Sequence, residues 1–233
     1  MAQNWDWTAG AADATVIFDI QRTTDSTPRI QMFEEAGLVV KFGFNNRALG
    51  LCMNAIRSSA LDYEKLPMHV AERKVLGTGS LPEAKAVLGK FGVASSINFA
   101  IADKEGRLGT IECSPLGSSL ITPDMEGVCH SDHLVSPNIP KGLKDYPASN
   151  SYARLARIKE LSVSVKPSFE SVRKRLSEEE NYPLAICRYA PPQSSGMASI
   201  CTLSTMIIDV KNMRAKLPLG RPSLKPPVKV MTM

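Results

Sequence analysis

The side chains best suited to chemistry lie in two short stretches of the chain. One is the run Cys129-His130-Ser131-Asp132-His133, which offers a thiol, two imidazoles and a carboxylate within five residues. All of these groups can bind zinc. Neighbouring residues of an extended strand point to opposite faces, however, so the four groups cannot converge on one ion. We therefore expect no metal site, and two interpretations stay open: an active-site strand, or two hydrogen-bonded core histidines.

The second stretch is the run Gln3-Asn4-Trp5-Asp6-Trp7, which contains both tryptophans of the sequence. Amino termini are usually polar and frayed, whereas indole rings are usually at least half buried. The start of the chain is therefore expected inside the domain, although a surface-anchoring aromatic pair on a first strand is the alternative. Asp6 is either a neighbour of a reacting group or a half-buried strand carboxylate with an N–H partner.

Composition and charge narrow the class of protein. With 233 residues and 43% hydrophobic residues, the chain can bury one large core, and we expect a single domain over 1–233. Within it, 217–233 is a proline-rich tail with the last strand. The net charge of +5 favours anionic partners such as phosphates or coenzyme A. Because Lys and Arg are dispersed, without a dense stripe and interleaved aromatic residues, no nucleic-acid partner is expected.

The cysteines and the hydropathy pattern indicate the compartment. Five cysteines, an odd number, are widely spaced in apolar neighbourhoods, which is typical of reduced, buried thiols. No charged-then-apolar leader follows Met1, and no apolar run approaches the roughly 18 residues of a membrane span. These features predict a cytoplasmic protein with no membrane partner.

The order of the predicted elements favours a layered α+β domain. β-Branched and aromatic runs alternate with turn residues, and apolar residues at helical spacing follow proline or a capping serine. Strands are expected at 15–20, 29–33, 38–44, 49–56, 95–102, 108–113, 118–122, 184–189 and 202–210. Helices are expected at 66–76 and 80–89, from 149 or 150 to 161, and at 168–176.

Ten short motifs occur in an order and spacing that resemble a known family. They are Gln-Asn-Trp-Asp at 3–6, Glu-Ala-Gly at 35–37, Lys-Phe-Gly-Phe-Asn at 41–45, Asn54-Ala55, His69 with Arg73, Glu-Cys-Ser-Pro at 112–115, His-Ser-Asp-His at 130–133, Ile-Cys-Arg at 186–188, Asp209 and Leu-Gly-Arg-Pro at 219–222. The chain resembles the acyl-coenzyme A:6-aminopenicillanic acid acyltransferase family, which includes the isopenicillin N acyltransferases.

This resemblance implies the N-terminal nucleophile hydrolase fold, an αββα four-layer sandwich. It also implies a cysteine freed by self-cleavage, whose own α-amino group is the general base and whose thiolate forms an acyl-enzyme. In the family this cysteine lies on a strand before the Gln-Asn-Trp-Asp motif. We expect that amino-terminal strand to be absent here, so that the chain is a shortened form, inactive alone, that needs a missing amino-terminal chain as a partner.

The resemblance also assigns residues to the site. Asp6 would orient the nucleophile. Asp132 stands where the family has an asparagine that holds the oxyanion, and an ionised carboxylate cannot donate that hydrogen bond. Ser199 stands where penicillin-forming members have an arginine at the substrate end, so a substrate carboxylate would lose a charge-assisted partner there. We therefore expect the product not to be penicillin.

Four further positions are assigned to substrate binding. Trp7 and Thr8 match residues that line the acyl pocket, and the indole would make that pocket bulky and apolar. His130 belongs to the active-site strand. Ser114 matches the serine of a Ser-Pro turn, where a structural role is favoured over a catalytic one.

The functional expectation is an acyltransferase or amide hydrolase of secondary metabolism. Its partners would be a small-molecule amine or amide and an acyl donor; no bound cofactor is expected, and acyl-coenzyme A would be a co-substrate. Two alternatives stay open: a catalytically dead homologue that binds a small molecule or a partner, and a fragment that does not fold.

Overall fold

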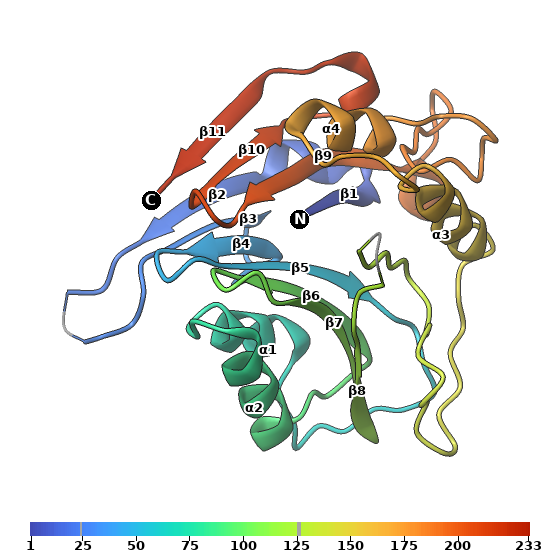
Figure 1. Ribbon diagram of the computed structural model, residues 1–233. Helices are drawn as coiled ribbons and strands as arrows, with labels where there is room; N and C mark the ends of the chain where they lie inside the picture. The colour runs from blue at the N-terminus through green and yellow to red at the C-terminus, as the bar shows by residue number, and fades with distance from the viewer. Residues whose placement is uncertain (24, 125–126) are drawn as a thin grey trace.

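The computed structural model describes residues 1–23, 25–124 and 127–233, and two antiparallel sheets stacked on each other form its centre (Figure 1). The smaller sheet has four strands in the order β1-β9-β10-β11, and the larger has seven in the order β2 to β8. The first sheet comprises β1 (Ala2–Thr8), β9 (Ile200–Asp209), β10 (Arg214–Pro218) and β11 (Val228–Thr232). The second comprises β2 (Thr15–Ile20), β3 (Ile30–Glu35), β4 (Phe42–Asn45), β5 (Leu49–Ala55), β6 (Ile97–Asp103), β7 (Leu108–Ser114) and β8 (Gly117–Ile121).

The position of β1 at the edge of its sheet matters for the site. β1 pairs with β9 through a register that places Trp5 opposite Ser204 and, after an irregularity, Asp6 opposite Thr202. Among the described strands β9 is its one partner, so the second edge of β1 is open. A sheet edge of this kind presents unpaired backbone N–H and C=O groups to another strand.

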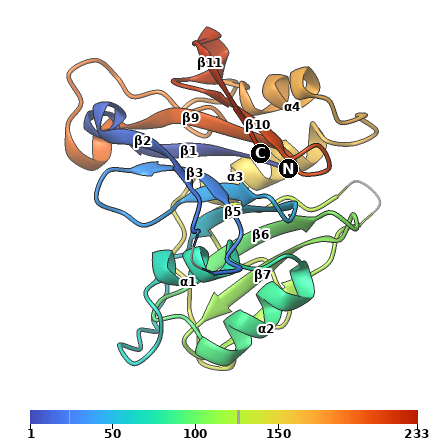
Figure 2. The ribbon, with the colours of Figure 1, turned by 90° about the vertical axis from the view of Figure 1, so that its left-hand side faces the viewer.

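Helices cover the outer faces of the two sheets, which gives four layers (Figures 1 and 2). The helices α1 (Met68–Val75) and α2 (Leu81–Phe91) pack on the seven-stranded sheet. On the other side α4 (Phe169–Leu176) packs on β9 and β1, and α3 (Ser151–Glu160) lies near it at one end of the sandwich. Short 3₁₀ turns complete the chain: η1 (Ala9–Ala14), η2 (Gly196–Ser199) and η3 (Pro222–Leu224).

Two apolar cores separate the layers. One lies between the seven-stranded sheet and the pair α1 and α2, where Met32, Val75 and Phe99 are buried. The other lies between the sheets, where Trp5 meets Phe33 edge-on at 5.6 Å between ring centroids. The αββα arrangement confirms the predicted α+β fold, and it places β1 against the core between the sheets.

Most predicted elements form where local signals were strong. Ser80 caps α2 by accepting the Glu83 N–H, with Pro82 in the first turn. The strand predicted at 184–189 is wrong, because this segment is irregular and is held by a hydrogen bond from the Cys187 N–H to the Glu178 carbonyl at 2.8 Å. The run 128–135 is also irregular rather than a strand. None of the helices in the described ranges is long and apolar enough to cross a membrane.

Candidate functional site

An arginine joins the two aspartates that the sequence analysis singled out. The Nη1 atom of Arg154 donates to Oδ2 of Asp6 at 3.1 Å, and Nη2 donates to Oδ2 of Asp132 at 2.6 Å. Arg154 and Asp6 are nearly buried, with side chains 12% and 11% exposed, whereas the Asp132 side chain is 38% exposed. The structure therefore brings Asp6 and Asp132 together, 126 positions apart in sequence, through a guanidinium from α3.

The second oxygen of Asp6 is also occupied. Thr202 of β9, which faces Asp6 across the strand pair, donates its hydroxyl to Oδ1 of Asp6 at 2.6 Å. Burial raises the pKa of Asp6 above its usual value, while the Arg154 guanidinium and the Thr202 hydroxyl oppose that shift. A carboxylate held in this way has a fixed orientation, which suits a group that positions a neighbouring reactant.

Asp132 is fixed from the seven-stranded sheet. Its Oδ1 accepts the Asn54 Nδ2–H at 3.1 Å, and Oδ1 of Asn54 accepts from Nδ2 of Asn98 at 3.3 Å. The Thr110 hydroxyl donates to Oδ1 of Asn98. Three adjacent strands, β5, β6 and β7, thus support one carboxylate. Both oxygens of Asp132 accept hydrogen bonds, so this side chain offers no donor to an oxyanion.

Glu112 of β7 positions the irregular segment that carries Asp132. Its carboxylate, which is 3% exposed, accepts the Val135 N–H at 2.5 Å and the Ser136 N–H at 3.1 Å, and it lies 2.8 Å from Nε2 of His130. Hydrogen bonds to a charged acceptor are among the stronger ones in proteins. The segment 128–135 forms no strand, so these hydrogen bonds to Glu112 hold it in place of the backbone hydrogen bonds between strands.

His133 is fixed separately from His130. Its Nδ1 lies 2.7 Å from Oγ of Ser151, and the Ser151 hydroxyl donates to Oγ of Ser131 at 3.2 Å. The ring is packed against Tyr152, with 4.1 Å between ring centroids. Burial lowers the pKa of His133, with a further contribution from His130. The side chains of both histidines are largely buried and hydrogen-bonded, which is compatible with the core alternative, and the role of His130 in an active site stays a prediction.

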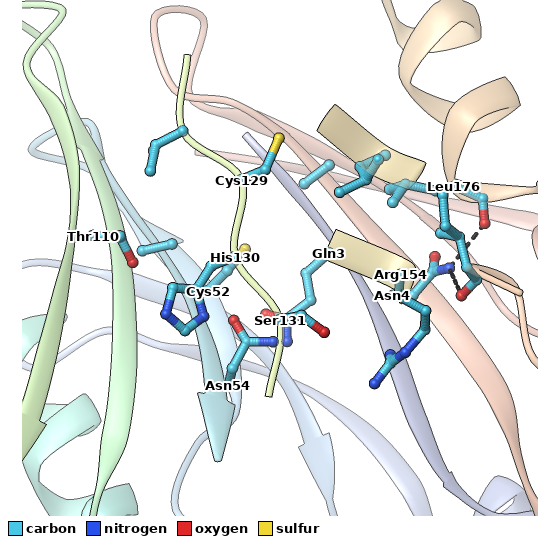
Figure 3. Close-up of a pocket in the computed structure, with 15 residues that line it drawn as sticks. Gln3, Asn4, Cys52, Asn54, Thr110, Cys129, His130, Ser131, Arg154 and Leu176 are labelled. Atoms are coloured by element: carbon cyan, nitrogen blue, oxygen red, sulfur yellow. Dashed lines mark hydrogen bonds between the residues drawn. The ribbon is translucent and has the colours of Figure 1, made fainter. Parts of the chain in front are cut away.

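A cavity of about 170 Å³ lies beside the open edge of β1 (Figure 3). In Figure 3, His130, Asn54 and Cys52 lie on one side of it and Asn4 and Arg154 on the other, and Asn4 donates to the carbonyls of Leu176 and Ile186. The lining residues are Ala2, Gln3, Asn4, Cys52, Asn54, Ala100, Thr110, Val128, Cys129, His130, Ser131, Arg154, Ile158, Leu176 and Ile186.

Two buried nitrogens on lining residues have no hydrogen-bond partner in the described part of the chain. They are Nδ1 of His130 and Nε of Arg154. A buried polar atom without a partner costs free energy, so these two nitrogens are held at a cost in the folded protein.

The other predicted site residues are more dispersed. Trp7 is 40% exposed and lies near Lys41, whose Nζ is 5.2 Å from the ring centroid, and Thr8 is the last residue of β1. Ser199 is buried and donates to the Gly196 carbonyl at 2.7 Å. Ser114 donates to the Gly117 carbonyl and accepts the Leu116 N–H, which is a turn function. The roles of Trp7 and Thr8 in substrate binding stay predictions.

None of the five thiols is set up as a nucleophile. Burial raises the pKa of Cys52 and Cys113 to about 12 and that of Cys187 to about 11, and it also raises the pKa of Cys129 and Cys201. The thiolate is the reactive form, so a raised pKa makes these groups poor nucleophiles at neutral pH. Within the described residues no group of three or more potential ligands could hold a metal ion.

Arg154 is the site residue that sequence reasoning missed. It is one of several basic residues in the sequence of α3, together with Arg157 and Lys159. Arg157 instead pairs with Glu178 and Glu180 near the surface. No local signal distinguishes these arginines, although the position of Arg154 three residues after the buried Ser151 would have placed it toward the core side of a helix.

Comparison with solved structures defines the class of fold. Penicillin V acylase from Agrobacterium tumefaciens superposes with a TM-score of 0.71 at 15% identity, covering 100% of this chain and 81% of that one. A variant of conjugated bile acid hydrolase from Clostridium perfringens gives 0.66 at 11% identity, covering 100% and 92%. The chain has the N-terminal nucleophile hydrolase fold of these proteins.

The sequence comparison then gives the family. The model of the acyl-coenzyme A:6-aminopenicillanic acid acyl-transferase family matches 1–224, and the chain belongs to that family. The 40 kDa form of acyl-coenzyme A:6-aminopenicillanic-acid-acyltransferase from Emericella nidulans is 29% identical over 233 residues. That alignment covers 99% of this chain and 63% of the relative, so the chain spans less than two thirds of the relative's length.

Proposed function

We propose that the chain is the scaffold of an acyltransferase or amide hydrolase that works through a cysteine acyl-enzyme, in secondary metabolism. Family membership supports acyl transfer or amide hydrolysis as the reaction type. The observation that carries the proposal is the Asp6–Arg154–Asp132 bridge, with its fixed carboxylates, directly beside an open sheet edge and a cavity. The resemblance assigns Asp6 to orient the nucleophile.

The nucleophile would come from a segment that adds to β1. The five thiols have raised pKa values, so they do not supply a ready thiolate. A strand placed on the open edge of β1 would gain backbone hydrogen bonds and would lie beside the cavity and Asp6. Its thiolate would attack the acyl carbonyl and release the donor's thiol or amine, and an amine or water would then take the acyl group.

Mass spectrometry tests this function. A form extended at its amino end by a strand that begins with a free cysteine is incubated with octanoyl-coenzyme A, alongside the 233-residue chain. We expect an octanoyl adduct on the added cysteine and none on the five cysteines of the shorter chain. An Asp6→Asn variant of the extended form should acquire the adduct more slowly. An adduct on one of the five, or none on the added cysteine, would contradict the proposal.

A second candidate is a small-molecule binding protein without catalysis. The Asp132 carboxylate favours it, because both oxygens accept hydrogen bonds where an oxyanion needs a donor. Turnover by the extended form separates the two candidates: a steady release of octanoate or octanoyl amide supports the enzyme, and an adduct that never turns over supports the binder.

A further inference from the structure

Lys41 is a largely buried lysine that contacts both tryptophans of the chain. It lies just before β4, and its side chain is 10% exposed. Its Nζ is 4.7 Å from the ring centroid of Trp5, 5.2 Å from that of Trp7 and 3.7 Å from Oε2 of Glu35. A cation is attracted to the face of an aromatic ring, and more strongly where water is excluded. The Lys41 ammonium therefore links β1 to Glu35, the last residue of β3.

The two indoles lie on either side of Asp6 in a strand that is irregular at this point. The register of β1 against β9 shifts between Trp5 and Asp6. An irregularity of this kind changes the direction in which side chains point. Trp5 and Trp7 both meet the Lys41 ammonium. The carboxylate of Asp6 between them is bound by Arg154 of α3. Lys41 thus contacts the strand immediately before and immediately after the residue that Arg154 binds.

The two tryptophans depend on Lys41 to different degrees. Trp5 is 5% exposed and also packs edge-on against Phe33. Trp7 is 40% exposed, and among the described residues no aromatic ring packs against it. Its ring contact is with the Lys41 ammonium. Loss of that charge should therefore free the Trp7 indole, at the end of β1 beyond Asp6, more than the Trp5 indole.

Neighbouring carboxylates offset part of the cost of burying Lys41. Burial lowers the pKa of its ammonium, and the negative charges of Glu35 and Glu72 act against that shift. Glu35 ends β3, and Glu72 lies on α1 with a side chain that is fully buried. A buried charge without such partners costs free energy. Both the carboxylates and the indoles thus compensate the buried cation.

We propose that Lys41 is a positioning residue of this site. By holding the indole on each side of Asp6, it fixes the backbone of β1 and keeps the Asp6 carboxylate directed at Arg154. Lys41 acts through Asp6 rather than on the reactants. The inference rests on the proposed function, which gives Asp6 the task of orienting the nucleophile.

The rate of acyl-adduct formation tests this role. In the extended form, Lys41→Met keeps a side chain of similar length and removes the charge. At saturating octanoyl-coenzyme A we expect about tenfold slower acylation of the added cysteine, the size of a desolvated cation–aromatic contact, with an unchanged half-saturating concentration. Adding Lys41→Met to Asp6→Asn should cause no further loss, because both changes act through one carboxylate. Lys41→Arg keeps the charge and should restore most of the rate.

Tryptophan fluorescence of the 233-residue chain tests the contact itself, without turnover. Both tryptophans contact Lys41, so quenching by acrylamide reports on that residue. Lys41→Met should raise the quenching constant, and Lys41→Arg should keep it near that of the parent chain. Lys74→Met is the matched control, since Nζ of Lys74 is 4.3 Å from the ring centroid of Phe91, and it should leave the constant unchanged.

Three results would overturn the inference. They are an unchanged quenching constant in Lys41→Met, an unchanged acylation rate in that variant, and a further loss of rate when Lys41→Met is added to Asp6→Asn. Lys41→Gln repeats both measurements if the methionine variant does not fold. A missing adduct on the extended parent form would instead defeat the proposed function, and the quenching comparison would still decide whether Lys41 holds β1.

Discussion

Two regions of this molecule each hold a pair of carboxylates, and the groups that neutralise the carboxylates differ between the two regions. At the candidate site, Arg154 bridges Asp6 and Asp132, and each of the four carboxylate oxygens has a partner. Between α1 and the seven-stranded sheet, Glu34 and Glu72 are 1% and 0% exposed, and one oxygen of each has no partner among the described residues. Within that same part of the chain, neither glutamate forms an ion pair with Lys or Arg.

The pKa values show which groups compensate for burial in each region. Burial raises the pKa of Glu34 and Glu72 to about 7, although His69, 2.8 Å from Oε2 of Glu72, acts against the shift of both. At the site, burial likewise raises the pKa of Asp6, and the Arg154 guanidinium and the Thr202 hydroxyl act against that shift. The site therefore depends on one arginine for its ion pairs, whereas the region under α1 has no Lys or Arg ion pair to its two glutamates among the described residues.

Removing Arg154 should give the largest of the predicted effects, which is a loss of stability. Arg154→Met keeps the length of the side chain but leaves Asp6 as an uncompensated buried charge, so we expect a loss of about 3–5 kcal/mol in the free energy of unfolding. Urea denaturation at pH 7 measures it. Arg214→Met, at an exposed pair with Asp209, is the control and should lose less than about 1 kcal/mol. Equal losses in the two variants would contradict the comparison.

Restoring an amide at the site should give the next largest effect. In the extended form, Asp132→Asn supplies an N–H donor to the oxyanion, and such a donor contributes about 2.7–4 kcal/mol to transition-state stabilisation. Steady-state hydrolysis of octanoyl-coenzyme A should then rise by about 100-fold or more. Unchanged or lower turnover would mean that pairing with Arg154 is the function of Asp132.

The pH dependence of stability tests the second region, where Glu34 and Glu72 are buried under α1. Because the folded-state pKa of Glu72 is raised from 4.5 to about 7, its contribution to stability is fully present below pH 4.5 and is lost as the pH rises through about 7. Glu72→Gln should remove this loss and, at pH 8, stabilise the protein by on the order of 2 kcal/mol.

Thermal unfolding between pH 5 and 8 measures this dependence. Glu170→Gln, which changes a glutamate on α4 that is 70% exposed, is the control and should leave the curve of the parent chain unchanged. Because the pKa of Glu34 is also raised to about 7, part of the fall should remain in Glu72→Gln, and a fall as steep as that of the parent chain would contradict the prediction.

The open edge of β1 should give the smallest of the predicted effects, which is a tendency of the chain to associate. Unpaired backbone groups favour association, so the 233-residue chain should form dimers or larger species as its concentration rises. Sedimentation velocity from micromolar to millimolar concentration measures this, and the extended form, in which the edge is paired, is the control. A chain that stays monomeric over that range would speak against an available edge.

Local signals in the sequence predicted much of the fold. These signals act within a few residues and do not depend on distant parts of the fold. Examples are the serine cap and early proline of α2 and the β-branched run of β2. The segment 184–189 shows where this fails. Its apolar residues resemble a strand, but Ala185, Ile186 and Cys187 are buried without joining a ladder, because tertiary packing overrides β-propensity.

The amino-acid sequence by itself indicated the family through its short motifs and the layered α+β class through the order of its predicted elements, and the motifs include Asp6 and Asp132. These signals are local, so they can be recognised without knowing which distant residues are in contact. Only the tertiary structure decided that Arg154 joins those two aspartates and that Glu34 and Glu72 are both buried under α1. Charge pairing depends on distances of a few ångströms between residues far apart in the chain, and spacing along the sequence does not encode those distances.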